Sequence, residues 1–212
     1  MKLGGMSSLG TNLLELVYPT RCALCGALGP VPCAACESQF EKHDVGVQYF
    51  DDGPLAYRGS VFLYRGVAAE AVQALKYRRA TSLARWMSRQ IADFVDAHDL
   101  EYDVVVPVPI HWSRRAQRGF NQAEMLAESL GGRFELLART KRTKPQVGLT
   151  REARLTNLAG AFEASRAVRG HYVLLIDDVL TSGGTATECA RCLLGAGASA
   201  VGILTFAGEP FS

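Results

Sequence analysis

The sequence predicts an α/β fold in which helices cover both faces of a parallel β-sheet, preceded by a small four-cysteine module. Three observations predict it. Strand-like and helix-like segments alternate along most of the 212 residues, which is typical of parallel sheets. Several strand-like segments are unbroken runs of Val, Leu and Ile, as expected of strands that are buried on both faces. Four of the six cysteines lie within a span of 15 residues near the amino terminus.

Length and composition exclude several classes of protein. The 212 residues suffice for one sizeable core and a small appendage. Lys and Arg number 23 against 21 Asp and Glu, and this net charge of +2 argues against a protein that coats nucleic acid or an anionic membrane. No apolar run approaches the ~20 residues of a membrane span. The amino terminus lacks the basic and apolar regions of a signal peptide, so we expect a cytoplasmic protein.

Apolar periodicity and turn residues predict the elements in order along the chain. Helical spacing of apolar residues predicts helices, two of which end at Pro19 and at the Gly pair 131–132. Runs of β-branched, aromatic and other apolar residues between turn residues predict strands. The expected helices are 9–17, 67–77, 83–97, 121–130 and 185–194. The expected strands are 57–64, 103–109, 134–137, 171–176 and 200–206.

Two further stretches lack such periodicity. Residues 48–54 are acidic and rich in turn residues, which indicates a linker. Residues 139–156 are polar and basic, which indicates a long loop. We therefore expect two domains: residues 1–45, a helix followed by the cysteine module, and residues 46–212, the α/β domain.

The cysteine cluster has the spacing of a structural zinc site. Cys22 and Cys25 form one C-x-x-C pair, and Cys33 and Cys36 form a second. Two such pairs supply four thiolates for tetrahedral Zn²⁺ and leave no position for a catalytic water. Two disulfides would need an oxidising compartment, and a redox C-x-x-C would need only one pair, so zinc is the interpretation we favour. The other two cysteines lie in the helical stretch 185–194 and are expected to be core thiols rather than a second metal site.

A Gly-rich turn after the strand 171–176 carries the residues of a ligand site. Asp177 and Asp178 come first, and Gly183 and Gly184 then let the backbone approach a ligand closely. N–H groups at a helix start suit a phosphate, while two adjacent carboxylates suit a vicinal diol or Mg²⁺. Ligands bind at such turns in open α/β sheets; the alternative is an ordinary capped turn with a solvated acidic pair. The hydroxyls of this turn belong to Thr181, Ser182 and Thr185.

Residues 176–185, IDDVLTSGGT, resemble the phosphoribosyl pyrophosphate (PRPP) signature of type I phosphoribosyltransferases. Further motifs are similar to those of the ComF/GntX family, and this likeness extends from about residue 14 to residue 206. The motifs are Lys76-Tyr77, PVP at 107–109, RGFNQ at 118–122, LTREARLTN at 149–157 and GAF at 160–162. The resemblance implies an amino-terminal zinc finger joined to a type I phosphoribosyltransferase domain.

The resemblance also implies roles for individual residues. Asp177 and Asp178 would hold the ribose hydroxyls as the catalytic pair, and residues 181–185 would bind the 5′-phosphate. The pyrophosphate loop of type I enzymes matches residues 107–111, and their mobile hood matches the basic stretch 139–154, whose alternative is a basic surface loop. The candidates for pyrophosphate or for the flexible loop are Pro107, Arg114, Arg115, Arg118, Lys141, Arg142 and Lys144.

The charge distribution agrees with a local site for a small polyanion. Residues 108–154 carry 10 basic and 4 acidic side chains, a net charge of +6, which leaves −4 on the rest of the chain. Such a patch can attract a ligand such as PRPP. It can equally contact nucleic acid, if Tyr102, Trp112 and Phe120 offer rings for stacking rather than for the core.

The sequence therefore predicts a Mg²⁺-dependent transferase that moves a phosphoribosyl group from PRPP to an acceptor and releases pyrophosphate, with Zn²⁺ in a structural role. No set of residues identifies the acceptor. The alternative is a non-catalytic accessory or sensor protein of DNA uptake and competence, which binds single-stranded DNA or a partner, because this fold alone does not establish catalysis. Related folds commonly form homodimers, and the oligomeric state is left open.

Overall fold

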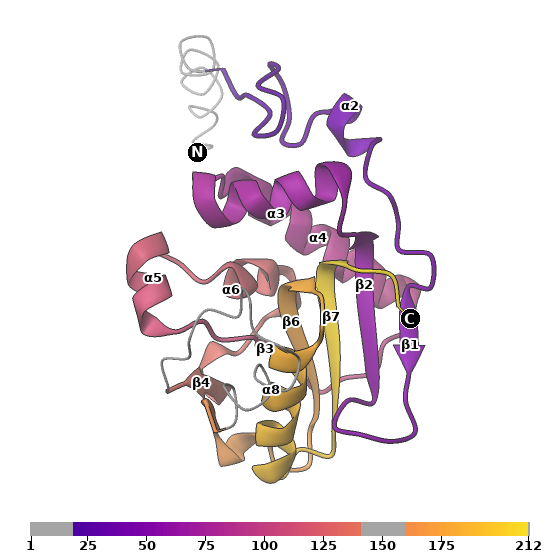
Figure 1. Cartoon of the computed structure of the whole chain (residues 1–212), viewed down its shortest axis with the longest axis vertical. Helices are drawn as coiled ribbons and strands as arrows, with labels where there is room; N and C mark the ends of the chain where they lie inside the picture. The colour runs from indigo at the N-terminus through magenta and orange to yellow at the C-terminus, as the bar shows by residue number, and fades with distance from the viewer. Residues whose placement is uncertain (1–18, 141–159, 212) are drawn as a thin grey trace, which may run out of the picture.

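A computed structural model describes residues 19–140 and 160–211 (Figure 1). The predicted helix 9–17 and all but the first two residues of the predicted loop 139–156 lie outside these residues. A five-stranded sheet forms the centre of the described chain, in the spatial order β1-β2-β7-β6-β3. Its strands are β1 (Val47–Tyr49), β2 (Tyr57–Leu63), β3 (Val104–Pro107), β6 (Tyr172–Leu180) and β7 (Ala200–Gly208).

The sheet is parallel except at one edge. Strand β2 pairs with β7, β7 with β6, and β6 with β3, all in parallel, while β1 pairs with β2 in antiparallel fashion. Parallel neighbours need crossover connections, and helices supply them. The longer helices are α3 (Gly66–Arg78), α4 (Ser82–Ala97) and α8 (Gly184–Gly195). The shorter ones are α2 (Ala34–Glu37), α5 (Trp112–Arg118) and α6 (Gln122–Leu126).

Alternate residues of the central strands point into two separate cores. In β6, Leu174 and Ile176 join the core beneath α3 and α4, whereas Val173 and Leu175 join the core beneath α8. This alternation follows from the two-residue period of a strand and explains why the strand is apolar throughout. Figure 1 shows α8 in front of the sheet and α4 behind it. The predicted α/β fold with helices on both faces is confirmed, with the antiparallel β1 as an addition.

Four of the expected elements need correction. The expected helix 121–130 is divided into α6 (Gln122–Leu126) and a 3₁₀ turn (Glu128–Leu130). Residues 48–54 are not a linker, because β1 covers residues 47–49 and the rest of the stretch lies within the β1–β2 hairpin. The expected strand 134–137 is a 3₁₀ turn (Phe134–Leu136) followed by β4 (Leu137–Arg139), which pairs with β5 (Phe162–Ala164). Strand β6 continues past Ile176 to Leu180, since Val179 and Leu180 still pair with β7.

The cysteine module lies above α3 in the view of Figure 1 and joins the sheet core through aromatic contacts. Phe40 follows α2 and lies 5.0 Å from Phe62 and 4.7 Å from Trp86, measured between ring centroids. The indole N–H of Trp86 donates a hydrogen bond of 3.1 Å to the Glu37 carboxylate. Backbone N–H of His43 donates to Val61 at 3.1 Å. The chain therefore already contacts β2 before the expected domain boundary at residue 45.

The two remaining cysteines lie on α8, as expected, and away from the cysteine module. Cys189 is fully buried in the core beneath α8, and Cys192 is partly buried against it. Burial raises the pKa of both thiols. Within residues 19–140 and 160–211, they are not part of any group of side chains spaced to hold a metal ion. Among the same residues, no helix is both long and apolar enough to cross a membrane.

Candidate functional site

A cavity of about 690 Å³ opens beside the carboxyl ends of β3 and β6, between these strand ends and the helices α3 and α5. Open α/β sheets bind ligands at this edge because loops rather than further strands follow there. Polar and charged side chains dominate its wall. The lining includes Tyr64, Lys76, Tyr77, Arg79, Pro109, Arg114, Gln117, Arg118, Gln122, Arg139, Asp177, Asp178, Thr181 and Thr185.

The two acids of the sequence motif lie inside β6 rather than in the turn after it, and each continues one face of the strand. Asp178 points to the α3 side of the sheet, as Leu174 and Ile176 do. Its Oδ1 lies 2.9 Å from Lys76 Nζ, and the two groups form an ion pair. Both side chains are largely buried, at 5% and 19% exposure. The second carboxylate oxygen of Asp178 has no hydrogen-bond partner among the described residues.

Asp177 follows Val173 and Leu175 onto the α8 side. Burial, followed by the negative charge of Asp178, raises the pKa of Asp177 from 3.8 to about 7, against the opposing charges of Lys76 and Arg118. Burial disfavours the charged form of Lys76, yet the carboxylates of Asp178 and Asp177 raise the pKa of Lys76 above its ordinary value. One ammonium group thus neutralises Asp178, while the raised pKa of Asp177 means that this carboxyl group changes its protonation state near neutral pH.

The loop between β6 and α8 forms a second, smaller hollow of about 50 Å³ next to the large cavity. Its wall contains Asp177, Thr181, Ser182, Gly183, Gly184 and Thr185. Gly183 occupies the N-cap of α8 with φ +70°, a left-handed conformation that favours glycine. Because glycine has no side chain to cap the helix, the first N–H groups of α8 face this hollow without such a cap. The hollow therefore has the donors and the size of a site for a single phosphate group.

Four arginines line the large cavity: Arg79 at the end of α3, and three others from elements that follow later in the sequence. Arg114 and Arg118 belong to α5, and Arg139 ends β4. Burial, together with the nearby positive charge of Arg114, lowers the pKa of Arg139. Arg118 lies over the ring of Tyr77, with 5.3 Å between the guanidinium carbon and the ring centroid. The described cavity thus carries more cationic than anionic groups.

The other predicted cations and Pro107 are not among the described residues that line the cavity. Arg115 is not among the residues that line the cavity and forms a 2.6 Å ion pair with Glu124. Pro107 pairs with Ile176 within the sheet, while the residues after it, from Val108 to Ile110, line the cavity. Three predicted residues, Lys141, Arg142 and Lys144, lie outside the described chain.

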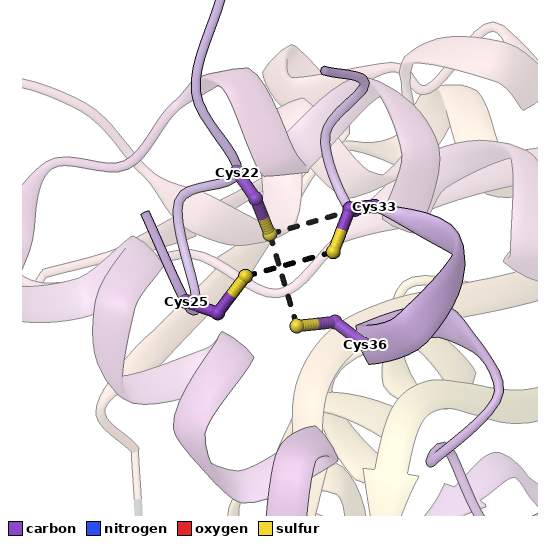
Figure 2. A group of neighbouring side chains, drawn as sticks. All are labelled: Cys22, Cys25, Cys33 and Cys36. Carbon is purple, nitrogen blue, oxygen red and sulfur yellow. Dashed lines mark hydrogen bonds between the residues drawn. The ribbon is translucent and has the colours of Figure 1, made fainter. Parts of the chain in front are cut away.

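The four cysteines of the amino-terminal module converge on one point. Figure 2 shows their sulfurs facing one another, and all four lie within 4.8 Å of each other. The Sγ atoms of Cys22 and Cys36 are 3.8 Å apart, and those of Cys25 and Cys33 are 3.6 Å apart. Disulfide sulfurs would be about 2.05 Å apart, whereas sulfurs at the corners of a zinc tetrahedron are about 3.8 Å apart for bonds of about 2.3 Å. The cluster is therefore compatible with a structural zinc site.

Backbone and thiol contacts shape the acidity of this cluster. Burial opposes ionisation of Cys22, but N–H groups of Cys25, Cys33 and Leu24 lower its pKa to about 6. The Cys33 N–H donates to Cys22 Sγ at 3.4 Å. Burial and the neighbouring thiols raise the pKa of Cys36 to about 12. The backbone thus favours the thiolate form of Cys22, whereas burial and the neighbouring thiols oppose ionisation of Cys36.

Sequence reasoning missed several cavity residues. Lys76 and Tyr77 appeared only within a family motif, and Arg79, Tyr64 and Gln117 were not singled out at all. The signal in the sequence was weak: the last turn of a helix that carries Lys, Tyr and two Arg in succession. These residues lie close to β6 because α3 lies across the strand ends. In the chain, more than 90 residues separate α3 from β6.

Comparison with known proteins gives a consistent result. Residues 77–210 match the family model described as a phosphoribosyl transferase domain. The DNA utilization protein YhgH of Escherichia coli (strain K12) is 33% identical over 141 residues, which cover 61% of this chain and 62% of that protein. The competence protein ComFC of Bacillus subtilis (strain 168) is 30% identical over 142 residues, which cover 66% of this chain and 59% of that protein.

The match thus spans less than two thirds of the length of these curated relatives. Among solved structures, the allosteric regulatory enzyme of purine biosynthesis aligns with 63% of this chain and 30% of its own, at 19% identity and a TM-score of 0.42. The family match covers more than half of the 212 residues and contains every strand of the sheet from β3 onward. The chain therefore belongs to the phosphoribosyl transferase domain family.

Proposed function

We propose that the chain binds PRPP in the cavity at the ends of β3 and β6 and transfers its phosphoribosyl group to an acceptor. The observation that carries this proposal is the joining of two subsites at one strand end. An uncapped helix start with Gly183 suits the 5′-phosphate. The carboxylates of Asp177 and Asp178 line the adjoining cavity and suit the two ribose hydroxyls. In PRPP the 5′-phosphate and the two hydroxyls belong to the same ribose, so two adjoining subsites can bind them together.

The arginines would serve the leaving group. A nucleophilic atom of the acceptor bonds to C1 of the ribose while the C1–O bond to pyrophosphate breaks, and the electron pair of that bond leaves with pyrophosphate. Negative charge therefore grows on pyrophosphate in the transition state, and preorganised cations stabilise it. Arg114 and Arg139 lie close enough for their charges to interact, both line the cavity, and the charge of Arg139 also interacts with Asp177. We assign pyrophosphate to this pair.

Two metal ions belong to this proposal. The four sulfurs fit Zn²⁺ in number, type and spacing, and this ion would stabilise the amino-terminal module without taking part in catalysis. Mg²⁺ prefers carboxylate and phosphate oxygens, and Asp177 is the acid in the cavity that Lys76 does not pair directly. When bound with PRPP, Mg²⁺ would neutralise charge on the pyrophosphate.

A thermal-unfolding assay with parts of the ligand tests the two subsites separately. A ligand at about 100 times its Kd stabilises the folded protein by about 2.7 kcal/mol. PRPP, ribose 5-phosphate and pyrophosphate should each raise the Tm of the wild type. Thr185→Ala should remove the shift caused by ribose 5-phosphate and keep the shift caused by pyrophosphate. Thr187→Ala, which lies on the same helix outside both hollows, is the matched control. No shift with PRPP would refute the proposal.

A second function, contact with single-stranded nucleic acid, is favoured by the surface of α5. None of its residues is buried, and Trp112 is 69% exposed beside Arg114 and Arg115. An exposed ring among cations can stack a base while the cations meet phosphates. Relatives named for DNA utilization and competence make this test worthwhile. Trp112→Ala should weaken a salt-dependent gel shift with single-stranded DNA, and absence of any shift at low salt excludes this function.

Three expectations remain proposals. We place the protein in the cytoplasm and divide it into two domains at residue 45, and a homodimer is the oligomeric state to be tested. Sedimentation velocity tests the dimer. Limited proteolysis tests the boundary, because cleavage near residue 45 should leave an α/β fragment of constant length.

A further inference from the structure

The cavity has a second wall that the roles assigned to PRPP do not use. It is formed by the end of α3, by Tyr64 from the link between β2 and α3, and by the end of α5. We call it the α3–α5 wall, and it consists of Tyr64, Tyr77, Arg79, Gln117 and Arg118. The phosphate loop, the acidic pair and the Arg114–Arg139 pair all belong to other elements or to the other end of α5. An acceptor that attacks the ribose has to lie against some part of this cavity, and this wall is the part without an assignment.

The α3–α5 wall is held together by direct contacts between its two helices. Arg118 lies over the Tyr77 ring at 5.3 Å, and its Nη1 donates a 3.0 Å hydrogen bond to the Gln122 side chain. Arg79 Nη2 donates to the backbone carbonyl of Gln117 at 3.4 Å. As a whole residue, Tyr77 is 68% exposed. An exposed ring and two guanidinium groups thus stand side by side as one surface.

The charge of this wall selects the kind of ligand that it can hold. Its two charged members, Arg79 and Arg118, are both cations, and the acids of the described cavity lining, Asp177 and Asp178, come from β6. A guanidinium binds a carboxylate through two parallel hydrogen bonds. A tyrosine ring offers its face to another flat ring, with a gain beyond simple burial. A planar ring that carries a carboxylate satisfies both groups at once.

The backbone of Arg79 supports a role for its side chain. Arg79 ends α3 in the left-handed conformation, with φ 54° and ψ 34°. Glycine is the usual residue there because it adopts this conformation without a steric penalty. The neighbouring ion pair does not account for the arginine, since Arg78 and not Arg79 pairs with Glu70. A strained position that carries a long cation directed into a cavity is typical of a binding site.

We propose that the acceptor is a planar aromatic acid, whose ring packs on Tyr77 and whose carboxylate is bound by Arg79 and Arg118. This inference rests on the proposed function, because it assumes that PRPP occupies the rest of the cavity. It reassigns Arg118 from pyrophosphate to the acceptor. A ring nitrogen or amino group on the acid donates its lone pair to C1 of the ribose as the C1–O bond breaks. When that nitrogen carries a proton, the departing pyrophosphate takes the proton up.

Matched pairs of acids and their amides test the proposal, because the members differ only in the carboxylate. The probes are nicotinate with nicotinamide, anthranilate with anthranilamide, and orotate with orotamide, each added to the full chain with PRPP and Mg²⁺. Pyrophosphate release is the readout. At least one acid should support release roughly tenfold or more faster than its amide, which corresponds to about 1.4 kcal/mol. Equal rates for acid and amide in every pair, or no release with any acid, would overturn the proposal.

Variants of the wall separate this inference from the proposed function. Arg79→Gln should lower the acid-to-amide ratio to about one, and Tyr77→Leu should slow release with both members of the pair. Both variants should keep the PRPP affinity of the wild type, measured calorimetrically without acceptor. Arg78→Gln, one residue away and outside the cavity lining, is the matched control and should behave as the wild type. Arg79→Gly, which suits the local backbone, should lose acid preference without a fall in Tm; a fall in Tm would indicate a structural role instead.

Calorimetric measurement of PRPP binding distinguishes a failure of this inference from a failure of the proposed function. If the wild type binds no PRPP, the proposed function fails and this inference fails with it. If PRPP binds and the acids show no advantage, the proposed function stands and the acceptor class is wrong. If Arg79→Gln weakens PRPP itself, Arg79 belongs to the PRPP site, and the assignment of the α3–α5 wall to an acceptor is overturned.

Discussion

The consecutive acids Asp177 and Asp178 have opposite electrostatic surroundings because neighbouring residues of a strand point to opposite faces. Asp178 faces α3 and forms a largely buried ion pair with Lys76, whereas Asp177 faces α8 and has its pKa raised to about 7. The sequence alone suggested two equivalent acids in a turn. The difference between them arises because β6 runs on to Leu180, which no local pattern indicated.

The Lys76–Asp178 pair leads to a stability prediction. Lys76→Met leaves a buried carboxylate without its counter-ion, and breaking such a pair costs about 3–5 kcal/mol. The free energy of unfolding, measured by urea denaturation at neutral pH, should fall by about this amount. Arg78→Met on the same helix breaks the exposed pair with Glu70 and should cost less than about 1 kcal/mol. Equal effects of the two substitutions would show that Lys76 is not a significant partner of Asp178.

Asp177 leads to a prediction about pH. Its pKa is raised from 3.8 to about 7 in the folded chain, so the folded state binds the proton more tightly than the unfolded state. Stability from this group is therefore lost as the pH rises from about 4 to about 7. Asp177→Asn removes this loss while Asp178, Lys76 and Arg118 remain. The Tm of the variant relative to the wild type should increase between about pH 4 and about pH 7; parallel Tm curves would contradict the raised pKa.

At the scale of elements, the cysteine module is coupled to the sheet core through a few aromatic side chains. Phe40, just after α2, contacts both Phe62 of β2 and Trp86 of α4, and Glu37 of α2 accepts a hydrogen bond from Trp86. The zinc ligands were predictable because two C-x-x-C pairs are a local pattern. The packing of the module on α4 was not, since it depends on which face of a distant helix carries Trp86.

This coupling predicts a signal from Trp86 when the metal is lost. Cys22→Ser removes one thiolate, so purified protein should hold less than the roughly one Zn²⁺ per chain expected of the wild type, and its Tm should fall. In a Trp112→Phe background, the fluorescence should change because Trp86 loses its Glu37 and Phe40 contacts. Cys192→Ser, on α8 and outside the cluster, should leave zinc content and fluorescence unchanged. Unaltered zinc content in Cys22→Ser would exclude the four-cysteine site.

Element prediction from sequence succeeded where one periodic pattern filled a whole element. The helix α4 has buried residues at helical spacing throughout, and its expected range of 83–97 differs by one residue from Ser82–Ala97. It failed at 134–137, where three residues form a 3₁₀ turn and the strand β4 exists only through its pairing with β5. A three-residue strand carries too little periodicity to be found locally, and its partner lies beyond residue 160.

At the scale of the whole molecule, the small net charge hides a polarised surface. The chain carries +2 overall, yet the described lining of its large cavity contains Arg79, Arg114, Arg118 and Arg139 beside two acids, Asp177 and Asp178. The phosphate loop and the acidic pair were predictable because they are contiguous in sequence. The α3–α5 wall was not, because it joins residues 64–79 with residues 117–118 only after the sheet has formed. Arg115 was also not predictable from a local pattern. The chain turns at Gly119, with φ +88°, and Arg115 then pairs with Glu124 instead of lining the cavity.

Isothermal titration calorimetry with PRPP and Mg²⁺ tests the central claim most directly, that the ends of β3 and β6 form a PRPP site. The wild type should bind PRPP with saturable heat at about one site per chain. The double variant Asp177→Asn/Asp178→Asn should bind roughly tenfold or more weakly, since each lost hydrogen bond to a charged group is worth about 1.5–3 kcal/mol. Glu70→Gln, an exposed acid on α3, should bind as the wild type does. Absence of heat in the wild type, or unchanged affinity in the double variant, would contradict the account.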